Sequence, residues 1–271
     1  MNYQDLFWKG DLFMNEVFEG RVVIVTGGAS GMGRATALKF GALGAKVAVS
    51  AGHNLTGAQE VADQINVNGG EAIALLCDVS KESDVEAMVN TVVEKWGRLD
   101  YAFNNAGTGP DGVRIGFGPL TELTEEIWDK TMDTNAKGVF LCMKYELRQM
   151  LKQGWPCSIV NNASIGGLHM APGFGAYGPS KAAVIALTQL AARENAPAQI
   201  RVNVVCPGPT EGTILMDNSK AASGGKDQSD VIPMGKMGTT DDVSNAVVWL
   251  CSPYAGHITG QSISVDGGMN M

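Results

Sequence analysis

The residues best suited to chemistry are Tyr177 and Lys181, which lie four positions apart in the segment YGPSK. Pro179 suits the first turn of a helix, and a helix that begins near it places both side chains on one face. An ammonium beside a phenol favours the phenolate, so Tyr177 becomes a usable acid or base nearer neutrality than its ordinary pKa of about 10. Ser164 stands thirteen residues earlier and adds a hydroxyl. Because such pairs also recur by chance, the pair needs supporting residues.

A glycine-rich segment follows the first β-branched run of the chain. The run RVVIVT at 21–26 leads into GGASGMG and then into the helix-forming residues RATAL. Strand, glycine turn and helix, in this order, direct free backbone N–H groups and a helix N-terminus at a pyrophosphate. Gly27, Gly31 and Gly33 permit the tight turn, the approach of the ligand and close helix packing. Glycine clusters also mark plain turns, but this position at the head of a strand–helix unit favours a dinucleotide site.

Strands and helices alternate along the chain. Apolar and β-branched runs predict strands at 21–26, 46–51, 72–77, 99–104, 157–163, 200–206 and 262–265. Helical patterns begin after the glycine turn and recur at 55–68, 85–96, 125–151, 182–192 and 243–250. We therefore expect an α/β fold, a single doubly wound Rossmann-type domain with a mostly parallel seven-stranded sheet and helices on both faces.

The expected domain spans residues 21–271 and follows an N-terminal extension at 1–20, to whose first thirteen residues we assign no chemistry. No linker or internal repeat divides it. The segment 210–236 contains the flexible composition SKAASGG. Because long loops in compact domains are commonly functional, we predict a mobile substrate lid there.

Small and polar residues follow several of the predicted strands. The carboxyl ends of parallel strands line the ligand crevice in such sheets. Asp78 and Val79 follow the third strand, and NNAG, from Asn104 to Gly107, follows the fourth. The second strand ends in AGH at 51–53, where an acidic residue usually binds the adenosine ribose and an arginine accepts a 2′-phosphate. Neither determinant is present.

Composition excludes several other classes of function. The net charge is −8 and 18% of the residues are charged, which argues against nucleic acid or an anionic membrane as the main partner. The five cysteines are widely spaced and the three histidines form no close pair, so we predict neither a disulfide framework nor a metal site. No apolar run reaches membrane-spanning length, and we expect a soluble, cytoplasmic protein.

Taken together, these motifs resemble the short-chain dehydrogenase/reductase family over nearly the whole chain, from about Arg21 to Gly268. The matching residues are Thr26-Gly27 with Gly31 and Gly33, Asp78, Asn104 to Gly107, Asn135, Ser164, Tyr177 with Lys181, and Pro207-Gly208. The resemblance implies hydride transfer between a nicotinamide cofactor and a carbonyl or alcohol carbon. Tyr177 would be the general acid in reduction and the base in oxidation, and Ser164 would bind the substrate oxygen. Lys181 would lower the pKa of Tyr177 and bind the nicotinamide ribose.

The same resemblance implies that Asn135 holds a water connecting Lys181 to solvent, although Asn135 could instead satisfy backbone groups in a helix kink. Asp78 would contact the adenine, or it could cap the next helix. The residues expected to bind the cofactor are Gly27, Ser30, Gly31, Met32, Gly33, Ala51, His53, Asp78, Val79, Asn105, Ala106, Gly107, Tyr177, Lys181, Pro207, Gly208, Thr210 and Thr213.

The chain departs from the family pattern at two places. Gly212 stands where members commonly carry a threonine that touches the carboxamide, and Thr213 is the nearest substitute. Ala51 replaces the acidic residue typical of NAD(H) binding, and no basic residue typical of NADP(H) stands at Ser30 or Gly52. With no carboxylate to repel a 2′-phosphate, we lean slightly toward NADP(H).

Residues flanking the catalytic positions are mostly apolar, which favours a secondary alcohol or ketone with an apolar body, although core or lid packing explains them too. They are Val113, Ser164, Ile165, Gly166, Leu168, His169, Met170, Phe174, Tyr177, Ile214, Leu215 and Met216. We thus predict an NAD(P)-dependent alcohol dehydrogenase or ketoreductase, a homotetramer by analogy with the family. A reductase of 3-oxoacyl groups on a carrier protein, which needs a basic patch, is an alternative. A dinucleotide-sensing regulatory or scaffold protein is the non-enzyme alternative.

Overall fold

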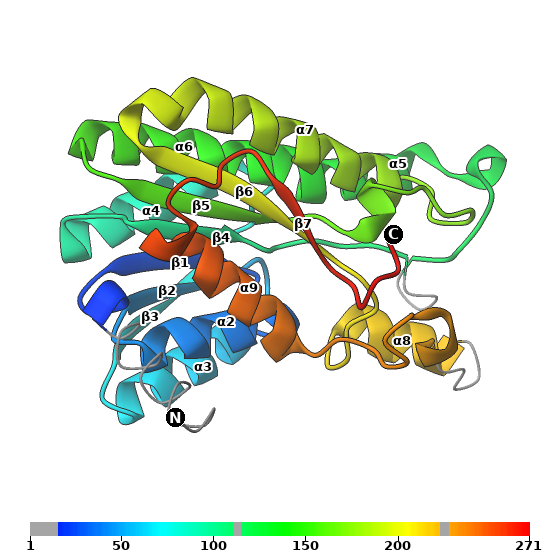
Figure 1. Cartoon of the computed structure of the whole chain (residues 1–271), viewed down its shortest axis with the longest axis horizontal. Helices are drawn as coiled ribbons and strands as arrows, with labels where there is room; N and C mark the ends of the chain where they lie inside the picture. Colours follow the sequence, from blue (N-terminus) through cyan, green and yellow to red (C-terminus); the bar gives the residue numbers. More distant parts are fainter. Residues whose placement is uncertain (1–15, 111–114, 223–227) are drawn as a thin grey trace, which may run out of the picture.

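A computed structural model describes residues 16–110, 115–222 and 228–271, and within them the chain forms one parallel sheet (Figure 1). The strand order is β3-β2-β1-β4-β5-β6-β7, so the predicted fold class is confirmed. All six strand pairings are parallel. The strands are β1 Val22–Thr26, β2 Lys46–Ala51, β3 Glu71–Leu76, β4 Tyr101–Asn104, β5 Cys157–Asn162, β6 Ile200–Pro207 and β7 Ser262–Val265.

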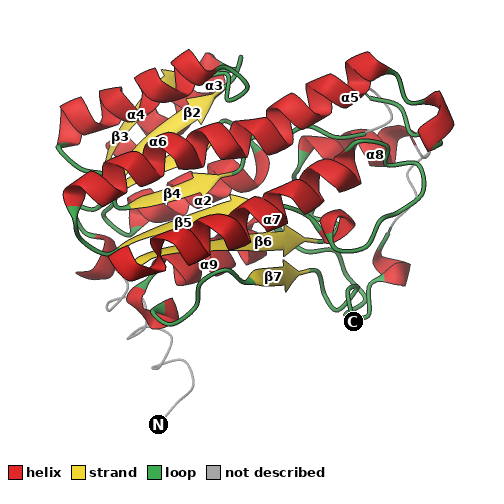
Figure 2. Ribbon diagram, turned by 90° about the horizontal axis from the view of Figure 1, so that it is seen from above, coloured by secondary structure: helices red, strands yellow, loops and turns green. Residues whose placement is uncertain are grey.

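Helices cover both faces of this sheet, with α4, α6 and α7 on one face and α2, α3 and α9 on the other (Figure 1). Viewed from above, the strands point toward the end of the sheet where α5 and α8 lie (Figure 2). The helices are α2 Gly31–Ala42, α3 Leu55–Val67, α4 Glu82–Trp96, α5 Glu125–Met132, α6 Gly138–Gln153, α7 Tyr177–Asn195, α8 Ile214–Ala222 and α9 Thr240–Cys251. None of the helices in the described ranges is long and apolar enough to cross a membrane.

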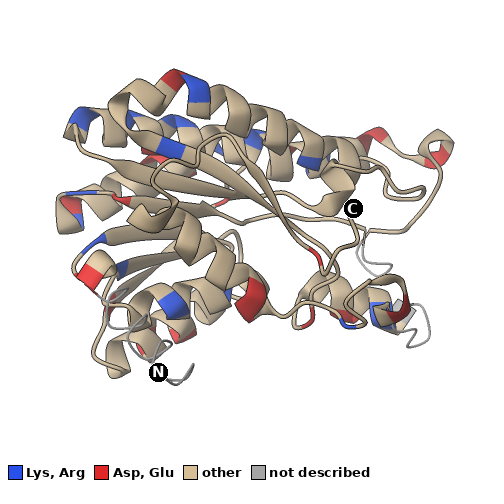
Figure 3. Cartoon of the chain, viewed as in Figure 1, with Lys and Arg blue, Asp and Glu red and all other residues tan. Residues whose placement is uncertain are grey.

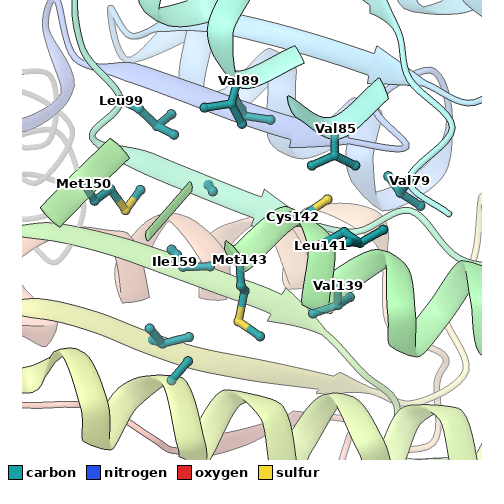
Figure 4. Close-up of a cluster of buried hydrophobic side chains, with 14 of the residues drawn as sticks. Val79, Val85, Val89, Leu99, Val139, Leu141, Cys142, Met143, Met150 and Ile159 are labelled. Carbon is teal, nitrogen blue, oxygen red and sulfur yellow. The ribbon is translucent and has the colours of Figure 1, made fainter. Parts of the chain in front are cut away.

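Two hydrophobic cores lie between the sheet and the helices that pack on its two faces. In one of them, Val85 and Val89 of α4 lie in the same layer as Cys142 and Met150 of α6 (Figure 4). The second core lies under α2, α3 and α9. All five cysteines are buried and unpaired, so they act as small apolar side chains. Strand β1 is buried from both faces, which explains its continuous apolar run VVIV.

The helix predicted at 125–151 is divided in the structure. A five-residue π-helical turn, Asp133–Lys137, joins α5 to α6. Such turns insert an extra residue into a helix and are frequent at functional sites. The helix expected from 182 begins earlier, at Tyr177, because Pro179 fits the first turn without breaking it. The predicted lid at 210–236 contains α8, and part of it, residues 223–227, lies outside the described residues.

Phe18 lies in the core, so packing begins before residue 21, where the domain was predicted to start. Its ring is fully buried and meets Phe40 at 5.3 Å and Tyr101 at 5.2 Å between ring centroids, both in edge contacts. Residues 1–13, to which the sequence assigned no chemistry, lie outside the described residues.

Replacing Phe18 by Ala should lower the free energy of unfolding by about 3–5 kcal/mol, because a large buried ring leaves a cavity among its neighbours. Urea denaturation measures the change. Val67→Ala is the control, since Val67 is 85% exposed and its loss should cost less than about 0.5 kcal/mol. Equal stability of the Phe18→Ala protein and the wild type would contradict this packing.

Candidate active site

A large cleft opens at the carboxyl ends of the strands. Its volume is about 1230 Å³, and it is lined by segments from the glycine turn to the C-terminus. Every predicted cofactor residue except Gly33 lines it, as do Ser164, Tyr177 and Lys181. The structure therefore brings together residues that are more than 180 positions apart in the sequence.

The glycine turn has the shape that a pyrophosphate requires. Gly27 and Gly31 have φ values of +62° and +53°, which side chains other than glycine rarely adopt. A Cβ on Gly33 would lie 2.2 Å from the carbonyl oxygen of Gly27, so Gly33 serves close packing of α2 rather than lining the cleft. Ser30 makes no side-chain cap on α2. The first N–H groups of this helix thus remain for an anion.

Asn105 ties the ends of β1 and β4 together beside this turn. Its backbone N–H donates to the Thr26 hydroxyl at 2.9 Å, and its side-chain amide donates to the Thr26 carbonyl at 3.1 Å. The Asn162 amide in turn donates to Asn105 Oδ1 at 3.0 Å. This bracing holds the floor of the cleft in one conformation.

Asn162 is a site residue that the sequence reasoning missed. Its carbonyl accepts the Lys181 Nζ hydrogen bond at 2.8 Å, and its Oδ1 is a buried acceptor without a partner among the described residues. The available signal was the polar pair that ends β5, an otherwise apolar strand that enters the crevice. An unpaired acceptor in the cleft is suited to a ligand donor.

Tyr177 and Lys181 lie close together, as predicted, but their electrostatics differ from the expectation. Lys181 Nζ lies 5.7 Å from the centre of the Tyr177 ring. Burial raises the pKa of Tyr177, a hydrogen bond with Ser164 lowers it in part, and Lys181 does not reverse the rise. Burial also lowers the pKa of Lys181 to about 8. Burial thus disfavours the charged form of both groups.

Ser164 is fixed at the start of a short helical turn, Ile165–Gly167, where its Oγ accepts the Gly166 N–H at 3.0 Å. Gly166 also keeps this region open, since a Cβ there would stand 3.4 Å from the Ser164 hydroxyl and 3.7 Å from the Tyr177 ring. A substrate oxygen can therefore meet both hydroxyl groups.

Asn135 lies in the π-helical turn and is fully buried. Its amide donates to the Thr108 carbonyl and to Ser180 Oγ, and its Oδ1 accepts the Thr108 N–H, at distances from 2.8 to 2.9 Å. The side chain does not line the cleft. It positions the loop after β4, and its predicted water remains a prediction.

The Asp78 carboxylate is occupied by local contacts. It accepts the Ser80 N–H at 3.1 Å and the Ser80 hydroxyl at 2.7 Å, and it lies 3.3 Å from Lys81 Nζ. These contacts hold the turn before α4, while Asp78 still borders the cleft. Desolvation raises the pKa of Asp78, but the contacts with Ser80 and Lys81 outweigh it and keep this pKa below its ordinary value.

At the start of the predicted lid, Thr213 stabilises α8. Its hydroxyl donates to the Thr210 carbonyl at 2.9 Å and accepts the Met216 N–H at 3.3 Å. Gly212 has a φ of +72°, which explains why glycine rather than threonine stands there. The lid begins directly beside the glycine turn, because a Cβ on Gly31 would lie 3.6 Å from Gly212 and from Thr213.

Beside Tyr177 the cleft has an apolar, aromatic wall. The Phe174 ring lies 6.1 Å from the Tyr177 ring and 5.6 Å from Phe117. The predicted residues that line this end are Ile165, Gly166, His169, Phe174, Ile214, Leu215 and Met216. Leu168 packs against the core instead, Met170 is 55% exposed outside the cleft, and Val113 lies outside the described residues. Phe117 was missed, because the loop that carries it has no periodic pattern.

Comparisons with known proteins agree with this geometry. Residues 27–270 match the family model described as enoyl-(acyl carrier protein) reductase. The chain belongs to the short-chain dehydrogenase/reductase family. A 2,5-dichloro-2,5-cyclohexadiene-1,4-diol dehydrogenase from Sphingobium indicum is 38% identical over 92% of this chain and 96% of its own. A 3-oxoacyl-[acyl-carrier-protein] reductase from Staphylococcus epidermidis is 39% identical over 92% and 98%.

Solved structures of the same family superpose closely. A 3-ketoacyl-(acyl-carrier-protein) reductase from Brucella melitensis, complexed with NADH, has a TM-score of 0.84 and 34% identity over 93% of this chain and 99% of its own. A short-chain type dehydrogenase/reductase from Mycobacterium marinum has the same TM-score and 32% identity, over 96% and 98%. The protein is thus a nicotinamide-dinucleotide-dependent oxidoreductase, and the uncapped α2 and the unpaired Asn162 Oδ1 fit that cofactor.

Adding a methyl group at Gly109 should misplace Tyr177. A Cβ there would lie 2.6 Å from the Tyr177 ring and 3.0 Å from Leu215. Gly109→Ala should therefore lower kcat about 10- to 100-fold, measured from the absorbance of the reduced cofactor. Gly116→Ala is the matched control, because nothing lies within 4 Å of the added Cβ. Equal losses of kcat in the two variants would contradict the inference that Gly109 leaves room for the Tyr177 ring.

Proposed function

We propose that this enzyme interconverts a secondary alcohol and a ketone with an apolar body, with Tyr177 as the general acid and base. The observation that carries the proposal is the aromatic wall, in which Phe174 lies beside the Tyr177 ring and Phe117 packs against Phe174. A free sugar would leave its hydroxyl groups unpaired against such a wall. A ring or alkyl chain would gain burial there.

The residues divide the work of the reaction. The bound dinucleotide supplies or accepts the hydride. Ser164 donates a hydrogen bond to the carbonyl oxygen, and Tyr177 gives that oxygen its proton in reduction or removes it in oxidation. Lys181, held by Asn162, places a positive charge close to Tyr177. The glycine turn and the start of α2 hold the phosphates.

Removing the phenol tests this assignment. Tyr177→Phe should lower turnover by at least about 10²-fold, because the variant lacks the phenol O–H that exchanges the proton. Binding of NADH and NADPH, measured by cofactor fluorescence, should stay within about twofold because the ring remains. Tyr254→Phe is the control, as Tyr254 is 58% exposed and does not line the cleft. Full turnover by the Tyr177→Phe variant would exclude the mechanism.

Phe117 should select substrates by their apolar bulk. Phe117→Ala should lower kcat/KM for a ring-bearing secondary alcohol about tenfold, but that for 2-propanol by much less, since only the ring reaches the wall. Phe140→Ala is a matched control, because Phe140 and Phe117 are both 46% exposed and only Phe117 lines the cleft. An equal loss for both alcohols would show that the wall does not contact the substrate body.

Reduction of a carrier-linked 3-oxoacyl group is the second candidate, and two of the relatives named above favour it, the carrier-protein reductases from Staphylococcus epidermidis and Brucella melitensis. Acidic and basic residues are interspersed over the helices (Figure 3). Among the described residues that line the cleft, Lys130 and Lys181 are balanced by Asp78 and Asp133, so they offer no basic excess for an acidic carrier. Turnover of carrier-linked substrate that falls steeply with salt, unlike that of a free thioester, would favour this candidate.

The choice of dinucleotide and the assembly are also proposals. Ala51, Gly52 and His53 line the adenosine end without a carboxylate, which supports a slight preference for NADP(H). Parallel titrations with NADPH and NADH test it. A homotetramer would cover exposed apolar residues such as Leu151 of α6 and Leu190 of α7, and sedimentation velocity reports its mass.

A further inference from the structure

A buried carboxyl group lies beneath the active site and takes no part in the reaction described above. Glu146 of α6 is fully buried, on the same helical face as Cys142, Met143 and Met150. These neighbours belong to the apolar core between α6 and the sheet (Figure 4). A carboxyl group in such a place costs free energy unless it is neutral or well paired.

The partners of Glu146 are amides. Asn104, at the end of β4, donates from Nδ2 to Glu146 Oε2 at 2.9 Å and to Asn161 Oδ1 at 3.0 Å. Asn161 then donates to the Thr188 hydroxyl of α7 at 2.9 Å. All four residues are at most 1% exposed. The cluster therefore joins α6, β4, β5 and α7 in the interior.

Two acceptors of this cluster have no donor in the described part of the chain. They are Glu146 Oε1 and Asn104 Oδ1, the second oxygen of each group in the pair. A carboxylate has only acceptors, so it cannot serve the amide oxygen. A neutral carboxylic acid carries one O–H, and together with the Asn104 N–H it can form the two parallel hydrogen bonds of an acid–amide pair. One proton thus satisfies both orphaned oxygens.

We propose that Glu146 is held as a neutral carboxylic acid and is a positioning residue for Lys181. The route is short and alternates hydrogen bonds with peptide links between neighbouring residues. Asn161 precedes Asn162, whose carbonyl holds Lys181 Nζ, and Asn104 precedes Asn105, which accepts the Asn162 amide. Asn104 and Asn161 are also direct register partners in the sheet. Holding this pair in place fixes the strand ends that carry the Lys181 anchor.

The surroundings of Glu146 favour the neutral form. The titratable groups that face it are the buried thiols of Cys77, after β3, and Cys142 on α6. On the α4 side, Val85, Met88 and Val89 belong to the same apolar core cluster. Burial raises the pKa of Glu146 to about 7, the Asn104 hydrogen bond opposes this rise, and no cation among the described residues contributes.

Two substitutions separate positioning from mere packing. Gln at 146 reproduces the acid's pattern, since its amide can donate to Asn104 Oδ1 and accept from Nδ2. Leu has a similar size but removes the acceptor for Asn104 Nδ2 and gives Asn104 Oδ1 no donor, so Nδ2 keeps only its hydrogen bond to Asn161. We expect Glu146→Gln to keep kcat within about twofold at pH 6, and Glu146→Leu to lose about tenfold in kcat while KM for the substrate changes little.

The pH profile is the readout that packing alone would not move. As pH rises from 6 to 9, wild-type Glu146 ionises and the Gln side chain does not. The ratio of kcat for Glu146→Gln to kcat for the wild type should therefore rise about threefold or more, with its midpoint near pH 7. Dividing by the wild type removes titrations that both proteins share, including those of Tyr177 and Lys181.

The kcat measurements rest on the proposed function. The stability of the protein gives a second test that does not depend on it. The folded pKa of Glu146 lies above its ordinary value of 4.5, so its stabilising effect is complete below about pH 4.5 and is lost as pH rises to about 7. The Tm of the Glu146→Gln protein minus that of the wild type should thus increase between about pH 4.5 and pH 7. Above pH 7 this difference should stay constant.

If the Tm difference between Glu146→Gln and the wild type does not change with pH, the proposal that Glu146 is a neutral acid is overturned, whatever the substrate of the enzyme is. If Tm shifts as expected but the kcat ratio stays flat, the acid is structural and its role in positioning Lys181 is overturned. Loss of kcat in Glu146→Gln equal to that in Glu146→Leu would also overturn positioning through the amide pair. If the Tyr177→Phe variant keeps full turnover, only the proposed function is overturned, because the Tm test of Glu146 does not depend on it.

Discussion

The hydrogen bond from Lys181 to the backbone carbonyl of Asn162 is the contact on which the arrangement of this active site depends. It joins the helix that carries Tyr177 and Lys181 to the strand that precedes Ser164. A buried ammonium needs such an acceptor, because desolvation otherwise drives off its proton. A backbone carbonyl cannot rotate away like a side chain, so the lysine is fixed as firmly as the sheet itself.

The fold meets this demand by making the sheet rigid where the chemistry occurs. Hydrophobic layers on both faces bury the central strands, and polar groups gather at their carboxyl ends. Those groups are hydrogen-bonded to one another, through Thr26, Asn105 and Asn162. Preorganised polar groups in a dry cleft need little rearrangement during reaction, which is a main source of catalytic power.

Much of this arrangement follows from the sequence, for reasons that are local. Strand runs, helical stripes and the glycine spacing each depend on a few neighbouring residues, and the motifs Ser164, Tyr177 and Lys181 were recognisable together. The π-helical turn at 133–137 was not, because no residue type marks it and a tertiary contact of Asn135 with Thr108 stabilises it. The direction of the Tyr177 pKa shift was wrong for a similar reason, since burial is a property of the assembled cleft.

The five buried cysteines have a consequence for how the motion of this protein can be followed. Cys142 lies in the core beside Glu146, and burial raises the pKa of its thiol well above the ordinary value. A thiolate forms there only when the region opens to water. The rate at which a small disulfide reagent labels this thiol under native conditions thus reports how often the core opens locally, without any added probe.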